Sequence, residues 1–272
     1  MVHAIPCKCP SILKQWAERS RHWPQPDVVQ KVVSFGAFVT PTGFKGSENK
    51  YFEWRICFNT SETELINNLH STQAKLYVIL KMIVKHILKP NNKEITSYVL
   101  KNIILWQAES NSPTMFQEIN LFHWLNDALE ALKTAISSTQ LPYYMIPERN
   151  LMAACGLKEE QQRKWVADIT DMIEEGPRVI LRLPKIRQAI IGHPEPLLWF
   201  SSRRLELEML ALEEMNRHYQ CRDENGEHNV WDVRLRAIRW CRNAIVLAIF
   251  QRMRNEGSDC INLVDIKRRM LM

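Results

Sequence analysis

The sequence has 272 residues, of which 46% are hydrophobic, and its 36 Lys and Arg against 30 Asp and Glu give a net charge of +6. This is the composition of a globular protein with enough apolar residues for a substantial core. Seven cysteines without a framework-like spacing exclude a disulfide scaffold and favour a reducing compartment, the cytoplasm or alternatively the nucleus. The longest apolar run, Ala244 to Phe250, is too short to span a bilayer, so no membrane partner is expected.

The positive charge is concentrated in the C-terminal part of the chain. Residues 178–272 carry 17 Lys and Arg against 12 Asp and Glu, which is a net +5 and leaves +1 for the rest. Because acids are interleaved with these bases, a solvated surface is the simpler interpretation, and attraction to nucleic acid is the alternative.

The N-terminal segment predicts short helices followed by strands. Residues 11–21 read as a helix between prolines, and residues 28–33 as another. The apolar, β-branched run 35–40 precedes a Pro-Thr-Gly turn, and residues 51–58 form an alternating aromatic segment typical of a strand. Ser61 and Glu64 stand at capping-box spacing and predict that a helix begins there.

Helices are predicted for most of the remaining chain. Only 8 glycines, with abundant Leu, Lys, Arg and Glu between proline-marked breaks, favour helices over many short strands. Apolar residues recur at helical spacing from Thr72 until Pro90 ends the run. Further helical segments are residues 97–108, 121–136, 165–173 and 179–191.

Two prolines and a glycine in residues 192–196 predict a boundary, after which residues 197–219 and 231–253 form a helical hairpin joined by the loop 223–227. The fold class expected is mainly α, a helical bundle with a small residual β-sheet near the N-terminus and a C-terminal helical hairpin. The expected domains are residues 1–60, 61–191 and 197–272.

Five residues form a candidate nucleotide site: Arg55, Lys81, Ser97, Tyr98 and Lys101. A nucleotide requires cations for its phosphates, an aromatic face for its base and short polar groups for orientation. A hydroxyl, a ring and a cation at one helix start suit such a ligand, because a helix N-terminus favours anions. The alternative is structural: the arginine forms a salt bridge, the lysines are solvated, and the tyrosine packs between helices.

A second candidate site is a row of arginines in the tail. Arg236, Arg239 and Arg242 follow one another at helical spacing and could bind the phosphates of a nucleic acid, which would make binding fall steeply with salt. Acids of the preceding helix, among them Glu213 and Glu214, offer the competing interpretation of salt bridges within the hairpin. That interpretation is preferred.

Three stretches in order, residues 53–58 (Glu-Trp-Arg-Ile-Cys-Phe), 97–101 (Ser-Tyr-Val-Leu-Lys) and 141–151 (Leu-Pro-Tyr-Tyr-Met-Ile-Pro-Glu-Arg-Asn-Leu), carry a resemblance to a known family. Over residues 1–185 the chain resembles the Mab-twenty-one (male-abnormal) family, which includes cyclic GMP-AMP synthase and similar nucleotidyltransferases. The resemblance implies a poly(A) polymerase-like helical lobe, and nucleotide contacts at the five candidate residues. It also implies ATP or GTP with Mg²⁺ as ligands of an active full-length parent.

The chain departs from the family pattern where catalysis is concerned. The resemblance implies that the carboxylates that hold magnesium in the family lie mostly upstream of the segment present here. Gly46-Ser47 followed by Glu53-Trp54-Arg55 imitates the family's pattern of a Gly-Ser turn and two acids only superficially, because the cation Arg55 cannot ligate magnesium. We therefore expect a truncated member that keeps the nucleotide-facing lobe without transferase activity of its own, with a role in nucleic-acid sensing or innate immune signalling. No catalytic or metal-binding residue is assigned.

Two further expectations concern partners. No zinc is expected, because residues 61–80, where a zinc thumb would lie, contain His70 and no cysteine. Apolar surface left by a missing lobe makes a homodimer plausible. The alternative function is a non-catalytic helical scaffold that binds protein or RNA through the basic C-terminal tail.

Overall fold

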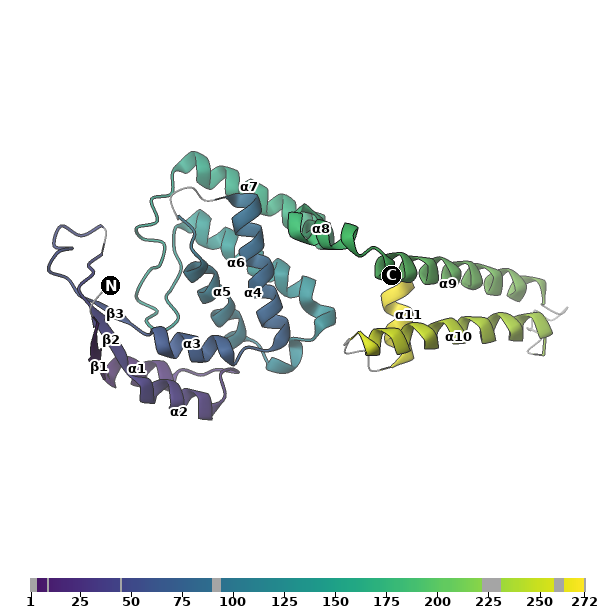
Figure 1. Ribbon diagram of the computed structural model, residues 1–272, viewed down its shortest axis with the longest axis horizontal. Helices are drawn as coiled ribbons and strands as arrows, with labels where there is room; N and C mark the ends of the chain where they lie inside the picture. The colour runs from purple at the N-terminus through teal and green to yellow at the C-terminus, as the bar shows by residue number, and fades with distance from the viewer. Residues whose placement is uncertain are drawn as a thin grey trace. The chain divides into compact units, whose positions relative to one another are not determined.

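The computed structural model describes residues 4–8, 10–44, 46–89, 94–221, 231–256 and 262–271. The chain divides into two compact units, residues 1–184 and 185–272 (Figure 1). The sequence placed the main boundary at residues 192–196 and separated residues 1–60 from the following helices. In the structure, residues 1–60 and the helices that follow them contribute side chains to one core, and the domain bounds expected from the sequence stay a prediction.

The first unit combines a small sheet with a helical bundle. Its elements are β1 (Ile5–Cys7), α1 (Pro10–Glu18), α2 (Pro26–Phe35), β2 (Ala37–Thr40), β3 (Arg55–Cys57), α3 (Asn59–Asn67), α4 (Ser71–Ile83), α5 (Ser97–Ser110), α6 (Leu121–Ser138) and α7 (Glu159–Glu175). A π-helical turn, Val84–Leu88, extends α4, and short 3₁₀ turns lie at Pro113–Met115, Glu118–Asn120 and Gly176–Arg182.

The sheet is antiparallel in the order β1-β2-β3. Ile5 pairs with Val39, and Val39 pairs in turn with Ile56, so the three strands are held in a single register. Helix α3 follows β3 directly and packs against both α2 and β2. Beyond it, α4, α5 and α6 pack against one another (Figure 1). The predicted fold, a helical bundle with a small sheet at its N-terminal end, is confirmed.

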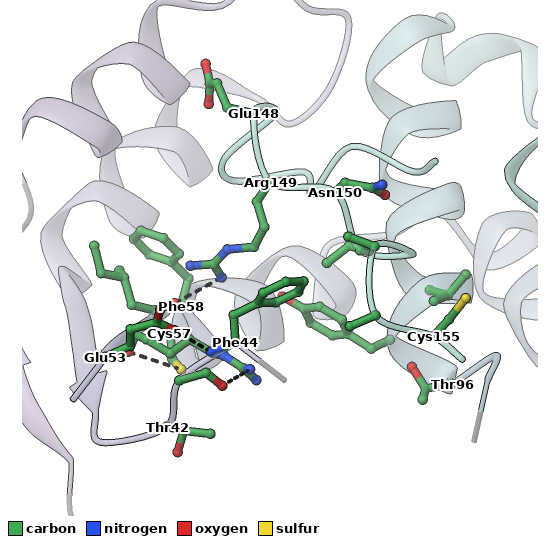
Figure 2. A pocket seen from close by; sticks show the side chains of 18 of the residues that line it. Thr42, Phe44, Glu53, Cys57, Phe58, Thr96, Glu148, Arg149, Asn150 and Cys155 are labelled. Atoms are coloured by element: carbon green, nitrogen blue, oxygen red, sulfur yellow. Dashed lines mark hydrogen bonds between the residues drawn. The ribbon is translucent and has the colours of Figure 1, made fainter. Parts of the chain in front are cut away.

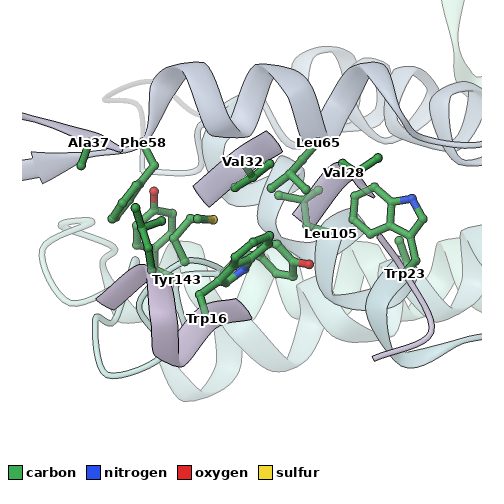
Figure 3. Packing of buried hydrophobic residues seen from close by; sticks show 13 residues of the cluster. Trp16, Trp23, Val28, Val32, Ala37, Phe58, Leu65, Leu105 and Tyr143 are labelled. Atoms are coloured by element: carbon green, nitrogen blue, oxygen red, sulfur yellow. The ribbon is translucent and has the colours of Figure 1, made fainter. Parts of the chain in front are cut away.

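The core of the first unit joins the sheet-bearing segment to the bundle. Trp16 of α1, Val32 of α2, Leu65 of α3 and Leu105 of α5 are all buried in it, together with Tyr143 from the loop after α6 (Figure 3). Burying such apolar and aromatic side chains supplies most of the free energy that fixes these elements together. The elements that form the walls of a site in this unit are therefore joined by a common core.

The described part of the second unit is a helical hairpin with one helix before it and one helix after it. Its elements are α8 (Pro184–Gly192), α9 (Glu195–Gln220), α10 (Val233–Asn255) and α11 (Leu263–Leu271). Helix α9 packs along α10, and Leu207, Val246 and Ile249 form their shared core with residues of α11. The predicted hairpin is confirmed, α11 was not predicted, and the expected loop 223–227 lies outside the described residues. None of the described helices is both long and apolar enough to cross a membrane.

Two local predictions are wrong. The strand expected over residues 51–58 is only Arg55–Cys57, because Phe52 and Glu53 donate to the Asn49 carbonyl and keep the preceding residues in turns. The expected capping box at Ser61 is absent. Helix α3 already begins at Asn59, and the Ser61 hydroxyl is buried and donates to the Val32 carbonyl at 3.4 Å.

The capping box of the described residues instead lies at the start of α4. His70 Nδ1 accepts from the backbone of Thr72, while the Gln73 side chain accepts from the backbone of His70. A histidine is an uncommon residue for this position, and the consensus pattern of serine or threonine with glutamate therefore did not find it.

Candidate functional site

A cavity of about 840 Å³ lies in the first unit between the sheet, the start of α5 and the loop after α6. Its walls come from the β2–β3 connection, from β3, from the first turns of α3 and α5, and from residues 148–155 (Figure 2). Arg55, Arg149 and Tyr98 line it, together with the aromatic side chains of Phe44 and Trp54. A cavity of this size with cations and rings in its wall can hold a molecule as large as a nucleotide.

The two guanidinium groups come from segments far apart in the sequence. Arg55 begins β3, is exposed, and donates from Nη2 to the Gly43 carbonyl at 3.4 Å. Arg149 lies in the loop after α6 and donates from Nη1 to the Ile56 carbonyl at 3.2 Å, with its guanidinium carbon 5.3 Å from the centroid of the Tyr143 ring. Each arginine therefore uses one donor to hold its position and retains others for a ligand.

Figure 2 shows Arg149 extending from its loop toward β3, whereas the neighbouring Glu148 points away from it. The carboxylate of Glu148 therefore does not neutralise the guanidinium beside it in the chain. The cavity wall also includes Glu53 and Glu94, so its charge is mixed.

The β2–β3 connection is held by Glu53. Its carboxylate accepts from the Phe44 backbone at 2.8 Å and from the Ser47 hydroxyl, and these bonds, the serine bond first, lower the pKa of Glu53. The same connection requires a glycine at position 43, since a Cβ there would overlap the backbone of Lys50. This wall of the cavity is therefore a turn held by hydrogen bonds between its own residues.

Beneath the cavity wall lies a buried carboxylate, Glu62 of α3. It accepts from the Tyr98 hydroxyl at 2.9 Å and from the Tyr143 hydroxyl at 2.6 Å, and it pairs with Lys101 Nζ at 2.7 Å. These three donors stand 36, 81 and 39 residues away in the sequence. We name Glu62, Tyr98, Lys101 and Tyr143 the Glu62 cluster; it fixes α3, α5 and the loop after α6 to one another.

Burial raises the pKa of both tyrosines in the Glu62 cluster well above the usual range. The negative charge of Glu62 adds to this effect, because it opposes a second negative charge on either ring oxygen. Both hydroxyls therefore keep their protons at neutral pH and donate them to Glu62. The half-buried Tyr98 ring lies in the cavity wall, and the hydrogen bond of its hydroxyl to Glu62 holds it in position.

A parallel cluster holds the next tyrosine of the same loop. The Tyr144 hydroxyl donates to Glu109 of α5 at 2.6 Å, and Arg19 Nε lies 2.8 Å from the same carboxylate. The Arg19 guanidinium also stacks 4.5 Å from the Trp106 ring centroid. The Leu-Pro-Tyr-Tyr loop is thus held by its two tyrosines, each of which anchors it to one buried acid.

The structure brings two of the five predicted nucleotide residues to the cavity, Arg55 and Tyr98. Lys101 is paired with Glu62 and serves the cluster beneath the wall. Lys81 is exposed near the Tyr77 ring, 5.2 Å from its centroid, and the Tyr77 hydroxyl donates to the Ser97 carbonyl at 3.3 Å. Ser97 and Lys81 thus lie near a common tyrosine on α4, outside the cavity lining. The nucleotide roles of all five stay predictions.

Sequence reasoning missed Arg149 and Glu62. Arg149 stands within the third stretch that carried the resemblance, and a charged residue in a loop beside buried tyrosines was a signal that could have identified it. Glu62 gave no local signal, because an acid in a first helical turn is ordinary and all of its partners are distant in sequence.

In the second unit, the structure places two of the three predicted arginines against an acid of the facing helix. Arg239 Nε donates to Glu214 at 2.9 Å, and Arg242 pairs with the other oxygen of the same carboxylate. Arg236 is exposed on α10. These pairs are the salt bridges preferred from the sequence, and nucleic-acid binding by the three arginines stays a prediction.

The residues present do not fit a pair of magnesium ions. Both oxygens of Glu53 are engaged in holding the β2–β3 connection, and the residue two positions further on is the cation Arg55, which cannot ligate a metal. Within the described ranges, no group of three His, Cys, Asp or Glu side chains is arranged to hold a metal ion.

Comparison with known families gives two matches in sequence order. Residues 1–68 match the Mab-21 protein nucleotidyltransferase domain, and residues 72–171 match the Mab-21 protein HhH/H2TH-like domain. The cavity is lined by residues from both matched segments, since Arg55 belongs to the first and Tyr98 and Arg149 to the second.

Curated relatives include two insect proteins named cyclic GMP-AMP synthase-like receptor. The protein of Aethina tumida is 29% identical over 146 residues, which is 51% of this chain and 34% of the relative. The protein of Ctenocephalides felis is 25% identical over 173 residues, which is 59% of this chain and 38% of the relative. The aligned regions thus span little more than a third of either relative.

Proposed function

The chain belongs to the Mab-21 family, and from that premise we propose that its cavity binds a nucleotide, with Arg55 and Arg149 at the phosphates and the Tyr98 ring against the base. The observation that carries this proposal is the meeting of two guanidinium groups and an anchored tyrosine in one cavity of about 840 Å³. The ligand expected is ATP or GTP.

The phosphate part of the proposal is supported by the donors that the arginines retain. A guanidinium carries five N–H donors in a planar fork that matches the oxygens of a phosphate, and each arginine here spends few of them on the protein. Charge-assisted contacts of this kind are each worth about 1.5–3 kcal/mol.

The base part is supported by the Glu62 cluster. The Tyr98 hydroxyl is held by Glu62, and the Lys101 ammonium lies 5.2 Å from the centroid of the Tyr98 ring. The ring is thereby fixed before a ligand arrives, so that stacking on a base would cost little conformational entropy. The Tyr98 side chain would act as a preformed platform.

For the activity of the whole protein, the named relatives suggest a part in nucleotide-based immune signalling, in the cytoplasm. We further infer that the residues described here bind the nucleotide without transferring it. This rests on the cation Arg55 two residues after Glu53, where it cannot ligate magnesium, and on the engagement of Glu53 by the Phe44 backbone and the Ser47 hydroxyl.

Thermal unfolding with and without millimolar ATP or GTP tests the binding proposal. A ligand at 100 times its Kd stabilises the folded chain by about 2.7 kcal/mol, which is readily seen as a rise in Tm. Arg149→Met and Arg55→Met should each weaken binding by about 10- to 150-fold. The matched control is Arg163→Met, because Arg163 is an exposed arginine of α7 whose side chain pairs only with Glu159 of its own helix among the described contacts.

The proposal fails if neither nucleotide raises the Tm, or if Arg163→Met weakens binding as much as the cavity variants. The inference about transfer has its own measurement: incubation with ATP, GTP and Mg²⁺ or Mn²⁺, followed by chromatography of the nucleotides. We expect no dinucleotide product, and its formation by this chain would refute that inference while leaving the binding proposal intact.

A further inference from the structure

Helix α9 carries a row of large apolar side chains on its outward face. Leu198, Leu205 and Leu212 follow one another at seven-residue intervals and are 63%, 59% and 58% exposed. Tyr219 continues the interval with 64% exposed, and Met209, between two of the leucines, is 70% exposed. Because seven residues make nearly two turns, these five residues share one face of the helix, which we name the α9 stripe.

The opposite face of α9 is already occupied by its own unit. Leu207 and Glu214 are buried, and they too are seven residues apart. Leu207 follows the stripe residue Leu205 by two positions, and Glu214 follows Leu212 in the same way. This places each about 200° around the helix axis from the stripe. Leu207 packs in the core with α10 and α11, while Glu214 binds Arg239. The α9 stripe is therefore additional to the apolar surface that the hairpin needs for its own fold.

We propose that the α9 stripe binds the same stripe of a second copy of this chain, in an antiparallel, two-fold symmetric pair. The row is symmetric about a point between residues 208 and 209. Turning a second helix about that point places Leu205 against Leu212 and Leu198 against Tyr219, with both Met209 side chains near the axis. Seven-residue spacing of apolar residues is the pattern that lets two helices pack along their length, and a two-fold contact uses the same patch on both copies.

The area of the α9 stripe is close to the lower limit for a specific dimer, which is about 1,000 Å² in total. Five side chains exposed by more than half offer roughly 100 Å² each, or about 500 Å² per copy, from apolar residues alone. A standard interface buries about 800 Å² per partner, with a polar rim around its apolar centre. The ion pair of Arg204 and Glu208, at 2.8 Å beside the stripe, supplies part of such a rim. Dissociation constants in the micromolar range are expected for this area.

This inference is independent of the nucleotide proposal. The matched family segments end at residue 171, whereas α9 begins at Glu195. The proposed dimer contact therefore lies outside the segments that match the family, and nucleotide binding in the cavity does not depend on it.

Sedimentation velocity on the full chain, from about 1 to 100 µM, tests the proposal against the expected micromolar dissociation constant. The double variant Leu205→Glu/Leu212→Glu should raise the dissociation constant of the dimer by at least about 100-fold, because four carboxylates would meet in the interface. The matched control is Trp240→Glu, a change of the same kind at a 72% exposed residue of α10. Circular dichroism establishes that each variant keeps its helices.

Cysteine cross-linking tests the antiparallel direction, with the parent chain as the baseline for its native cysteines. Met209→Cys should form a disulfide-linked dimer on mild oxidation, because position 209 lies near the axis. Leu198→Cys should not exceed the baseline, since an antiparallel partner places the two copies of residue 198 about 32 Å apart. A parent chain that is monomeric throughout the range overturns the proposal and leaves the stripe for a different protein. So does efficient cross-linking at 198, or a dimer abolished by Trp240→Glu alone.

Discussion

Replacing Glu62 with alanine should destabilise the first unit and weaken nucleotide binding together. Glu62 is 2% exposed and accepts from two tyrosine hydroxyls while it pairs with Lys101. In the variant Glu62→Ala, the hydroxyls of Tyr98 and Tyr143 lose the carboxylate that accepts from both of them, and the ammonium loses its counter-ion. Nothing else in the cluster can accept three hydrogen bonds.

The size of the effect follows from the burial of these groups. Removing one partner of a buried ion pair costs about 3–5 kcal/mol, because the remaining charge is left without compensation. The Lys101 side chain is 22% exposed and regains some hydration, which favours the lower end, about 3 kcal/mol. For a unit of this size, a loss of about 3 kcal/mol lowers the Tm by about 6–12 °C.

Urea unfolding of the parent chain and of Glu62→Ala measures the loss, and nucleotide titration measures the effect on the cavity. Glu62→Gln should lose about half as much stability, since the amide oxygen keeps one acceptor. The control is Glu64→Ala on the same helix, whose partner Lys31 is half-exposed, and its loss should be much smaller. The reasoning is refuted if Glu62→Ala costs less than about 1 kcal/mol, or if its nucleotide affinity equals that of the parent.

Three other outcomes are expected. Glu109→Ala, which leaves the Tyr144 hydroxyl and Arg19 without their carboxylate, should cost about 3 kcal/mol in urea unfolding, and a loss no larger than that of an exposed acid would contradict the assigned cluster. Because burial raises the pKa of Tyr143 in the folded chain, the contribution of Tyr143 to stability is complete below about pH 10 and is lost as the pH rises further. Above pH 10, the free energy of unfolding of Tyr143→Phe should therefore fall less steeply than that of the parent, by about 1.4 kcal/mol per pH unit. Equal slopes for the two chains would contradict this expectation. His70→Ala should lower stability by about 1 kcal/mol through loss of the α4 cap, with His70→Asp at least as stable as the parent in thermal unfolding, and an unchanged Tm for the alanine variant would argue against the cap.

Helix positions were predictable because their signal is local. In α6, Leu125, Leu129, Leu132 and Ile136 recur at helical spacing and are all buried, so the period in the sequence is the period of the core contact. Helix starts were less predictable. A serine with a glutamate three residues later is a usual sequence signal for a helix start. At Ser61 this signal was misleading, because tertiary packing placed the serine hydroxyl against the Val32 carbonyl.

The candidate site divides in the same way. Arg55 and Tyr98 were found from short motifs and do line the cavity. Arg149 and Glu62 were not found, since their importance comes from contacts with residues far along the chain. Lys101 was identified as a cation without its partner, and a sequence cannot say whether an ammonium faces a ligand or a buried acid.

The sequence by itself determined that this protein is a helical bundle of the Mab-21 family, followed along the chain by a helical hairpin, because periodicity and ordered motifs are properties of neighbouring residues. Only the tertiary structure decided which charged side chains form ion pairs within the protein and which line the cavity. The effect of a charge depends on its surroundings, and the carboxylate of Glu62 accepts from Tyr143, 81 positions further along the chain, only because the core brings the two residues together. For the same reason, the outward leucines of α9 became recognisable as a separate surface only when Leu207 and Glu214 were seen to occupy the inward face.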